Sequence, residues 1–268
     1  MKKRSEAMVV VKGGGEMASG VAHRLARSGF RVCLTEIPEP QAVRRGVAFC
    51  EAVFEGRKEV DGLVARRVTG EGEIFKAWEE KVIPLLVDPE CRIREILKSP
   101  ILVDAILAKK NTGTRLEDAP LVIGLGPGFR AGQDVHLVVE TNRGHNLGRV
   151  IEEGEAEPDT GVPGEIGGLT WERVLRAPAT GRFRAHKQIG DAALKGELVA
   201  EVGEVGVEAR IAGVLRGILR DGLYAAQGMK VGDIDPRGVR AHCFTISDKA
   251  RAIGGGVLEA ILMRSDQF

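Results

Sequence analysis

Three consecutive glycines, Gly13, Gly14 and Gly15, form the first candidate ligand-binding motif of the chain. They follow a short apolar run and precede a helical pattern at residues 16–28. Gly13, Gly15 and Ala18 match the G-x-G-x-x-G/A spacing of dinucleotide-binding units, in which the glycines make a tight turn and let a pyrophosphate approach the backbone. The helix would then offer free N–H groups to the phosphates. The pattern predicts a site for a nucleotide or a related phosphate-bearing ligand, and a turn kept only for packing is the alternative.

An acidic residue lies where such a unit binds a ribose. Glu36 ends a second apolar run, at residues 30–35, and lies 21 residues beyond Gly15, close to the spacing of about 20 residues in dinucleotide-binding units. Met17 falls in the first turn of the predicted helix. We therefore take Glu36 and Met17, together with the three glycines, as candidate cofactor-binding residues.

Two aspartates follow later strand-like runs. Asp88 comes directly after residues 82–87, and Asp104 comes directly after residues 101–103. A carboxylate at such a position can hold Mg²⁺ or a ligand hydroxyl, and a helix cap or a turn is the alternative. We keep both aspartates as candidate ligand-binding residues and predict no resident metal ion.

A second glycine loop follows the apolar run at residues 121–123. Its glycines Gly124, Gly126 and Gly128 could form a second anion-binding nest, to which Arg130 would add charge. A rigid turn, built with the proline between the glycines, explains the same residues. Both interpretations stay open, and the three glycines are retained as candidate cofactor-binding residues.

A polar cluster follows the apolar run at residues 135–140. Within it, Arg143 suits a phosphate or a carboxylate, and His145 could transfer a proton near neutral pH. We expect both side chains to face the same crevice as the first glycine turn, close to Gly126. The alternative is that both are surface residues of a turn.

In the first part of the chain, which carries these candidate residues, strand-like runs alternate with short helical patterns. Short helices are expected at residues 39–48, 73–80 and 91–98. The alternation is typical of an α/β protein with a Rossmann-like, doubly wound parallel sheet, in which ligands bind beyond the carboxyl ends of the strands. We predict this domain over residues 1–165, and a solvated acidic connector at residues 152–164.

The second half of the chain repeats itself with an offset of 32 residues, as in Ala177 and Ala209 or Gly181 and Gly213. The repeat predicts a small all-β sandwich with an internal two-fold repeat over residues 174–236. Its turns resemble the barrel-sandwich hybrid of biotinyl and lipoyl domains. The hairpin that carries the modified lysine in those domains, here residues 203–207, has no lysine, so we predict an unmodified structural or docking module. A C-terminal helix within residues 240–268 is expected to pack on the first domain.

Composition excludes several classes of protein. The 39 basic and 38 acidic residues give a net charge of +1, without the basic excess of a typical nucleic-acid-binding protein. Apolar runs are too short for a membrane span, and the run after the basic residues 1–4 is too short for a secretory signal. We expect a cytoplasmic protein with neither nucleic acid nor membrane as partner, and with four buried thiols. A homo-oligomer stays open.

In combination, several motifs resemble the YqeB-type proteins, which are proposed accessory proteins of selenium-dependent molybdenum hydroxylases. The resemblance extends over essentially the full length and rests on residues 12–20, 124–129, 134–136, 140–148 and 247–256. It implies a role in the maturation of such a hydroxylase, which would be the partner. It implies no assigned reaction and no agreed catalytic residues.

Two functions of different classes follow, with a third as the simplest alternative. The first is an accessory protein that binds a nucleotide or a molybdopterin-type cofactor and hands that cofactor, or its selenium or sulfur ligand, to the hydroxylase. The second is a nicotinamide-dependent oxidoreductase of unknown substrate. The sequence shows no obvious set of catalytic residues besides the glycine turn, which counts against this function. The candidate cofactors are NAD(P), FAD and molybdopterin. The third is a non-catalytic scaffold.

Overall fold

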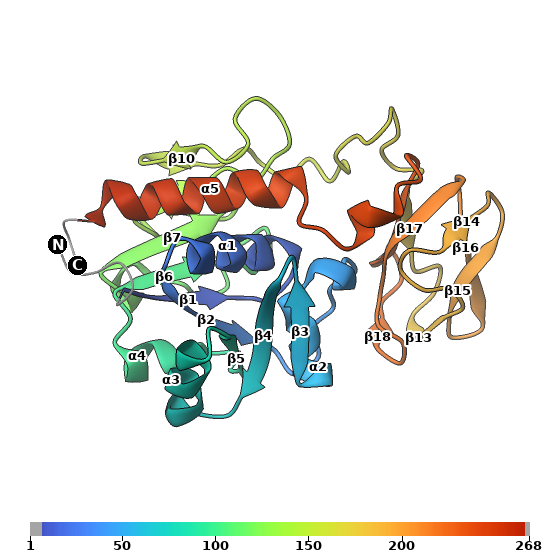
Figure 1. The fold of residues 1–268 in the computed structure, drawn as a ribbon. Coiled ribbons are helices and arrows are strands. Elements are labelled where there is room, and N and C mark those ends of the chain that lie inside the picture. Colours follow the sequence, from blue (N-terminus) through green and yellow to red (C-terminus); the bar gives the residue numbers. More distant parts are fainter. Residues whose placement is uncertain (1–6, 266–268) are drawn as a thin grey trace. The chain divides into compact units, whose positions relative to one another are not determined.

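A computed structural model of the chain describes residues 7–265, which divide into two compact units (Figure 1). The first unit comprises Met1–Pro40, Phe49–Thr160 and Ile246–Phe268, and the second comprises Gln41–Ala48 and Gly161–Thr245. The basic residues 1–4, used above to argue against a signal sequence, lie outside the described residues. Among the helices of residues 7–265, none has the length and apolar character that crossing a membrane requires.

Within the described residues, the first unit is built on a nine-stranded, mostly parallel sheet of order β10-β9-β7-β6-β1-β2-β5-β4-β3. The edge strands β3 and β10 are antiparallel to their neighbours. The chain proceeds from β1 to β2 on one side and places β6 on the other side of β1, so the strand order reverses between β1 and β6. In open α/β sheets, ligands bind at this point beyond the carboxyl ends of the strands. The strands are β1 (Met8–Lys12), β2 (Arg31–Glu36), β3 (Arg57–Val60), β4 (Leu63–Val68), β5 (Ile83–Val87), β6 (Ile101–Asp104), β7 (Leu121–Leu125), β9 (Leu137–Val139) and β10 (Val150–Ile151).

The apolar runs of the sequence form the central strands because both faces of the sheet are covered. Val9, Val10 and Val11 of β1 are fully buried, as expected for a parallel strand between two helical layers. The mixed α/β class with a large, mostly parallel sheet is therefore confirmed. A separate two-stranded sheet pairs β8 (Arg130–Ala131) with β11 (Gly154–Glu155), so the predicted connector contributes a short strand.

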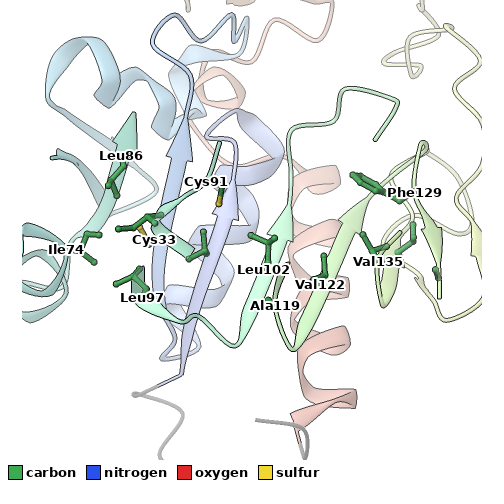
Figure 2. Packing of buried hydrophobic residues seen from close by; sticks show 14 of the residues in the cluster. Cys33, Ile74, Leu86, Cys91, Leu97, Leu102, Ala119, Val122, Phe129 and Val135 are labelled. Carbon is green, nitrogen blue, oxygen red and sulfur yellow. The ribbon is translucent and has the colours of Figure 1, made fainter. Parts of the chain in front are cut away.

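The two long helices of this unit lie side by side on one face of the sheet, and α3 and α4 lie on the other (Figure 1). The two long helices are α1 (Glu16–Arg27) and α5 (Asp248–Met263). Figure 2 shows the core that the second layer closes, in which Ile74 of α3 and Leu97 of α4 pack with Cys33 and Leu102 of the sheet. The remaining helices are η3 (Phe49–Glu51), α2 (Ala52–Glu55), α3 (Glu71–Glu79), α4 (Ile93–Leu97) and η4 (Leu116–Asp118).

The helix expected at residues 39–48 is absent from the described chain, and that prediction was wrong. This segment instead lies along β17 (Gly213–Ile218), where the Ile218 N–H donates to the Val43 carbonyl at 2.9 Å and Arg45 Nε donates to the Ile218 carbonyl at 2.8 Å. Only the short turn η2 (Arg45–Val47) is helical. Partners remote in sequence therefore hold this largely irregular segment in place.

In its described residues, the second unit contains two four-stranded sheets, of order β12-β19-β17-β14 and β16-β15-β13-β18. Strands β13, β14 and β15 begin 32 residues before β17, β18 and β19, and β12 precedes β16 by nearly the same interval. When each strand of the first sheet is replaced by its counterpart in the repeat, the order of the first sheet becomes the order of the second. The strand positions therefore follow the sequence repeat. Classification as a barrel-sandwich hybrid stays a prediction. The further elements are β12 (Val174–Arg176), β13 (Gly181–Ala185), β14 (Ala192–Ala193), β15 (Leu198–Val202), β16 (Val205–Glu208), β18 (Tyr224–Ala225), β19 (Lys230–Asp235) and η5 (Arg240–Cys243).

Candidate functional site

The glycine turn between β1 and α1 has one open position. Gly13 has a φ of +96°, which favours glycine, and a Cβ on Gly14 would lie 3.0 Å from the Cys50 nitrogen. At Gly15, by contrast, no heavy atom of the described residues, apart from Gly15 itself, its chain neighbours and the adjoining helix backbone, lies within 4 Å of the position that a Cβ would occupy. Gly15 is also the N-cap of α1, where backbone N–H groups lack intrahelical partners. The turn therefore leaves room for a ligand beside Gly15.

Glu36 contacts this turn from the end of β2. Its Oε2 accepts a hydrogen bond from the Gly14 N–H at 2.8 Å, and its Oε1 accepts one from the Ile37 N–H at 2.8 Å. Burial raises the pKa of Glu36 above its ordinary value of 4.5, and the two backbone N–H groups oppose that rise. Glu36 therefore lies beside the glycines, as its spacing in the sequence indicated. Its burial makes the ionised carboxylate less favourable than it would be in water.

A buried charged cluster occupies the point where the strand order reverses. Lys12 Nζ donates to Thr114 Oγ1 at 2.7 Å and lies 3.3 Å from Asp104 Oδ2, while Thr114 Oγ1 donates to the same carboxylate oxygen at 2.6 Å. The other oxygen, Oδ1, accepts from the Ile106 N–H at 3.2 Å. Asp104 and Thr114 are each 1% exposed. Asp104, a predicted site residue, thus lies at the carboxyl edge within a network.

Lys12 and Thr114 are not among the site residues predicted from the sequence. A lysine at the end of an apolar parallel strand is an unusual residue type, and that signal was available. Thr114 was not identifiable, because it reaches Asp104 only through a loop in which Asn111 Oδ1 accepts from the N–H groups of Gly113 and Thr114. The loop geometry, rather than a motif, brings the hydroxyl to the cluster.

Asp88 has the role of a turn and cap residue. Its Oδ2 accepts a hydrogen bond from the N–H of Ile93, the first residue of α4, at 2.9 Å, and its carbonyl accepts from the Cys91 N–H. This matches the alternative stated for Asp88 from the sequence. Met17, in the first turn of α1, is partly exposed.

The glycines of the second loop make room for neighbouring parts of the chain. A Cβ on Gly124 would lie 2.6 Å from the Phe129 ring, one on Gly126 would collide with Thr141, and one on Gly128 would lie 2.5 Å from the Lys110 Cα. Gly126 and Gly128 also have φ values of +75° and +103°. These contacts favour the rigid-turn interpretation. Arg130, which would have added charge to a nest, contacts Glu155 at 3.3 Å.

The polar cluster after β9 is organised by its own residues and by α5. The Glu140 carboxylate accepts from the N–H groups of Thr141, Asn142 and Glu157. Arg143 forms two hydrogen bonds with the Asp248 carboxylate, at 2.6 and 2.9 Å. Its guanidinium is therefore engaged by a carboxylate of this chain.

His145, the other candidate of this cluster, is exposed. Close by, a groove of about 460 Å³ is lined mainly by carboxylates, which disfavour a phosphate: Glu140, Glu152, Glu153, Glu155 and Glu157.

The cysteines lie in environments that disfavour the thiolate. All four are buried and free. Burial raises the pKa of Cys91 to about 11 and raises the pKa of Cys33, Cys50 and Cys243 as well. Because the thiolate is the nucleophile, these residues are unsuited to sulfur chemistry. Within residues 7–265, no group of three or more His, Cys, Asp or Glu side chains is arranged to hold a metal ion.

These features define the class: a mixed α/β protein with a glycine turn and a buried charged cluster at the carboxyl edge of a mostly parallel sheet. The chain is 51% identical over 260 residues to the uncharacterized protein YqeB of Escherichia coli (strain K12). The match covers 97% of this chain and 48% of that protein, so the chain spans about half the length of the curated relative. This identity supports the resemblance to YqeB-type proteins.

The other comparisons add no functional argument. No protein-family model matches the chain. The ectoine utilization protein EutE (DoeB) of Ruegeria pomeroyi, with product bound, is 14% identical, covers 85% of each chain and has a TM-score of 0.26. An aspartoacylase family protein of Mesorhizobium loti is 12% identical with a TM-score of 0.26, covering 85% of this chain and 84% of that one. Scores this low do not support a shared fold.

Proposed function

We propose that the chain binds a phosphate-bearing ligand, a nucleotide or a molybdopterin-type cofactor, at the turn formed by Gly13, Gly14 and Gly15. The observation that carries the proposal is the open space beside Gly15 at the start of α1, next to backbone N–H groups. Helix N-termini attract phosphates through such groups and through the helix dipole. Lys12, adjacent in sequence, brings a positive charge to the same edge.

The strand order supports a Rossmann-like interpretation of the first unit. When the β3–β4 hairpin and the antiparallel edge strand β10 are set aside, the strands β5-β2-β1-β6-β7-β9 have the order 3-2-1-4-5-6 of dinucleotide-binding folds. In those folds the pyrophosphate lies at the first turn and an acid at the end of the second strand binds the ribose. Gly15 and Glu36 are the corresponding residues, and the hydrogen bond between Glu36 and Gly14 brings them together.

Within this proposal, the ligand-facing residues are Gly13, Gly14, Gly15, Met17 and Glu36, whereas Asp104, which is 1% exposed, contributes through its ion pair with Lys12. Asp88 and the second glycine loop are assigned structural roles, because their hydrogen bonds and packing already account for them. Arg143 is assigned to the attachment of α5, since it binds Asp248. His145 has no assigned role.

The biological role that we propose is maturation of a selenium-dependent molybdenum hydroxylase in the cytoplasm. The support is the resemblance to YqeB-type proteins, to which the 51% identity adds. The ligand would be a molybdopterin-type cofactor or a nucleotide used in its handling, because molybdopterin carries a phosphate and its dinucleotide forms carry a pyrophosphate. The hydroxylase would then be the partner that receives the cofactor or its selenium or sulfur ligand.

A nicotinamide-dependent oxidoreductase is the second candidate, favoured by the position of Glu36 at the end of β2. A thermal-shift screen with NAD, NADP, FAD, CTP, GTP, ATP and molybdopterin tests the first proposal, because a ligand stabilises the state that binds it by about 2.7 kcal/mol at 100 times its Kd. We expect a rise in melting temperature with at least one of these ligands. A hydride-transfer assay with NADH and NADPH tests the second candidate. No stabilisation by any ligand would leave the scaffold interpretation.

A further inference from the structure

The cluster of Lys12, Asp104 and Thr114 contains a lysine whose burial needs a reason. The Lys12 side chain is 11% exposed and Asp104 is 1% exposed. A buried ion pair is weak evidence for stability, because removing both charges from water offsets most of their attraction. An apolar pair would fill the same space without that cost. The buried ammonium therefore indicates a function that requires its charge.

Lys12 retains hydrogen-bonding capacity within this cluster. An ammonium has three N–H donors. In the described part of the chain, Lys12 Nζ donates a hydrogen bond to Thr114 Oγ1 at 2.7 Å and forms an ion pair with Asp104 Oδ2 at 3.3 Å. Thr114 donates its own proton to Asp104, so the hydroxyl and the carboxylate orient the ammonium from one side. The ammonium therefore keeps donor capacity for an acceptor that enters from the carboxyl edge.

The glycine turn adjoins this cluster. Gly13 follows Lys12 directly, and a Cβ on Gly13 would lie 3.1 Å from the carbonyl oxygen of Ala105, the residue after Asp104. Lys12 and Asp104 occupy paired positions of β1 and β6. A ligand that crosses the edge between these strands therefore meets the turn and the ammonium together.

We propose that Lys12 recognises the phosphate charge of the ligand, and that Asp104 and Thr114 are positioning residues that hold its ammonium toward the carboxyl edge. This inference rests on the function proposed above and adds the residue that determines specificity: through Lys12, a phosphorylated compound is selected over its neutral, unphosphorylated counterpart. Lys12 donates a remaining N–H to a phosphate oxygen, a charge-assisted hydrogen bond of the stronger kind.

The experiment compares ADP and adenosine by isothermal titration calorimetry at low ionic strength. The wild type should bind ADP more tightly than adenosine. The double variant Lys12→Met with Asp104→Asn removes both charges, so that no buried carboxylate remains unpaired. It should lose at least tenfold in ADP affinity and keep its adenosine affinity. Lys76→Met, which removes an exposed lysine of α3, is the matched control and should bind both ligands as the wild type does.

Asp104→Asn alone gives a result of opposite sign, which a loosened structure would not produce. Removal of the carboxylate leaves the ammonium without its counter-charge, so ADP affinity should rise several-fold while adenosine affinity stays constant. Equal losses for ADP and adenosine in these variants would show a merely structural cluster and overturn the inference. So would a double variant that binds ADP as tightly as the wild type, although the proposed function would then survive. A wild type that binds neither ligand would overturn the inference, and with it an adenine nucleotide as the ligand of the proposed function.

Discussion

Glu36 is a residue whose ordinary chemistry is altered by its position against the glycine turn. Its carboxylate is partly buried and accepts two backbone hydrogen bonds, and burial raises its pKa above 4.5. The folded state therefore binds the proton of Glu36 more tightly than the unfolded state. The resulting contribution to stability is fully present below pH 4.5 and is lost as the pH rises through the higher, folded-state pKa.

Replacement of Glu36 by Gln should remove this pH dependence. Glutamine stays neutral, so the unfolding free energy of Glu36→Gln relative to wild type should increase between pH 4.5 and pH 7.5. A difference of one pKa unit between the folded and unfolded states corresponds to about 1.4 kcal/mol. Urea denaturation at several pH values measures the effect. The exposed Glu39→Gln is the control, and a pH-independent difference for Glu36→Gln would contradict the assignment.

Site residues differed in how far the sequence could predict them. Glu36 lies at the glycine turn as its spacing indicated. Arg143 could not be assigned from the sequence, because its partner Asp248 is 105 residues away in the chain. Asp88 and Asp104 look alike in sequence, yet one caps α4 and the other binds Lys12 and Thr114. Local motifs specify a turn, whereas the partners of a side chain depend on the tertiary fold.

Helix α5 shows at the scale of an element how glycines permit close packing. A Cβ on Gly254 would lie 2.9 Å from the carbonyl oxygen of Gly20 in α1, and one on Gly256 would collide with the Gly148 carbonyl. At Gly255, in the described chain, a Cβ would have no heavy atom within 4 Å apart from Gly255 itself, its chain neighbours and the backbone of its own helix. Two of the three glycines are thus explained by packing, which compensates for their low helix propensity.

Alanine at these positions should have effects of opposite sign. Gly255→Ala should stabilise the protein by about 1 kcal/mol, because alanine favours the helix and meets no neighbour. Gly256→Ala should destabilise it by about 2 kcal/mol or more, since the helix must move away from the Gly148 turn. Thermal unfolding followed by circular dichroism measures both variants. Equal stability of the two would contradict the packing that we describe.

The β3–β4 hairpin was not predicted, although a signal for it exists. Its turn residues Asp61 and Gly62 have φ values of +46° and +80°, and positive values at both positions are typical of the Asp-Gly turns that join two strands. Because β3 consists mainly of charged and largely exposed residues, its sequence does not show the alternation of apolar and polar residues that indicates a strand. The central strands were predictable because their apolar runs are buried on both faces.

At the scale of the whole molecule, the sequence predicted that the chain has an α/β unit and a β-rich unit. It did not predict correctly which segments belong to each unit. The 32-residue repeat marked the β-rich unit, whose strand starts follow it. The segment Gln41–Ala48, placed in the first domain by position along the chain, belongs to the second unit. Its hydrogen bonds to Ile218 join residues more than 170 positions apart, a pairing that no local pattern specifies.

The most direct test of the central claim is calorimetric titration of ADP into wild type and Gly15→Val. A valine side chain would occupy the open space beside Gly15, while its cost as a helix N-cap is only about 1 kcal/mol. We predict that the folded variant loses at least tenfold in affinity, whereas Gly255→Ala binds ADP as the wild type does. A folded Gly15→Val protein that binds ADP with wild-type affinity would contradict the account, because the phosphate would then bind elsewhere.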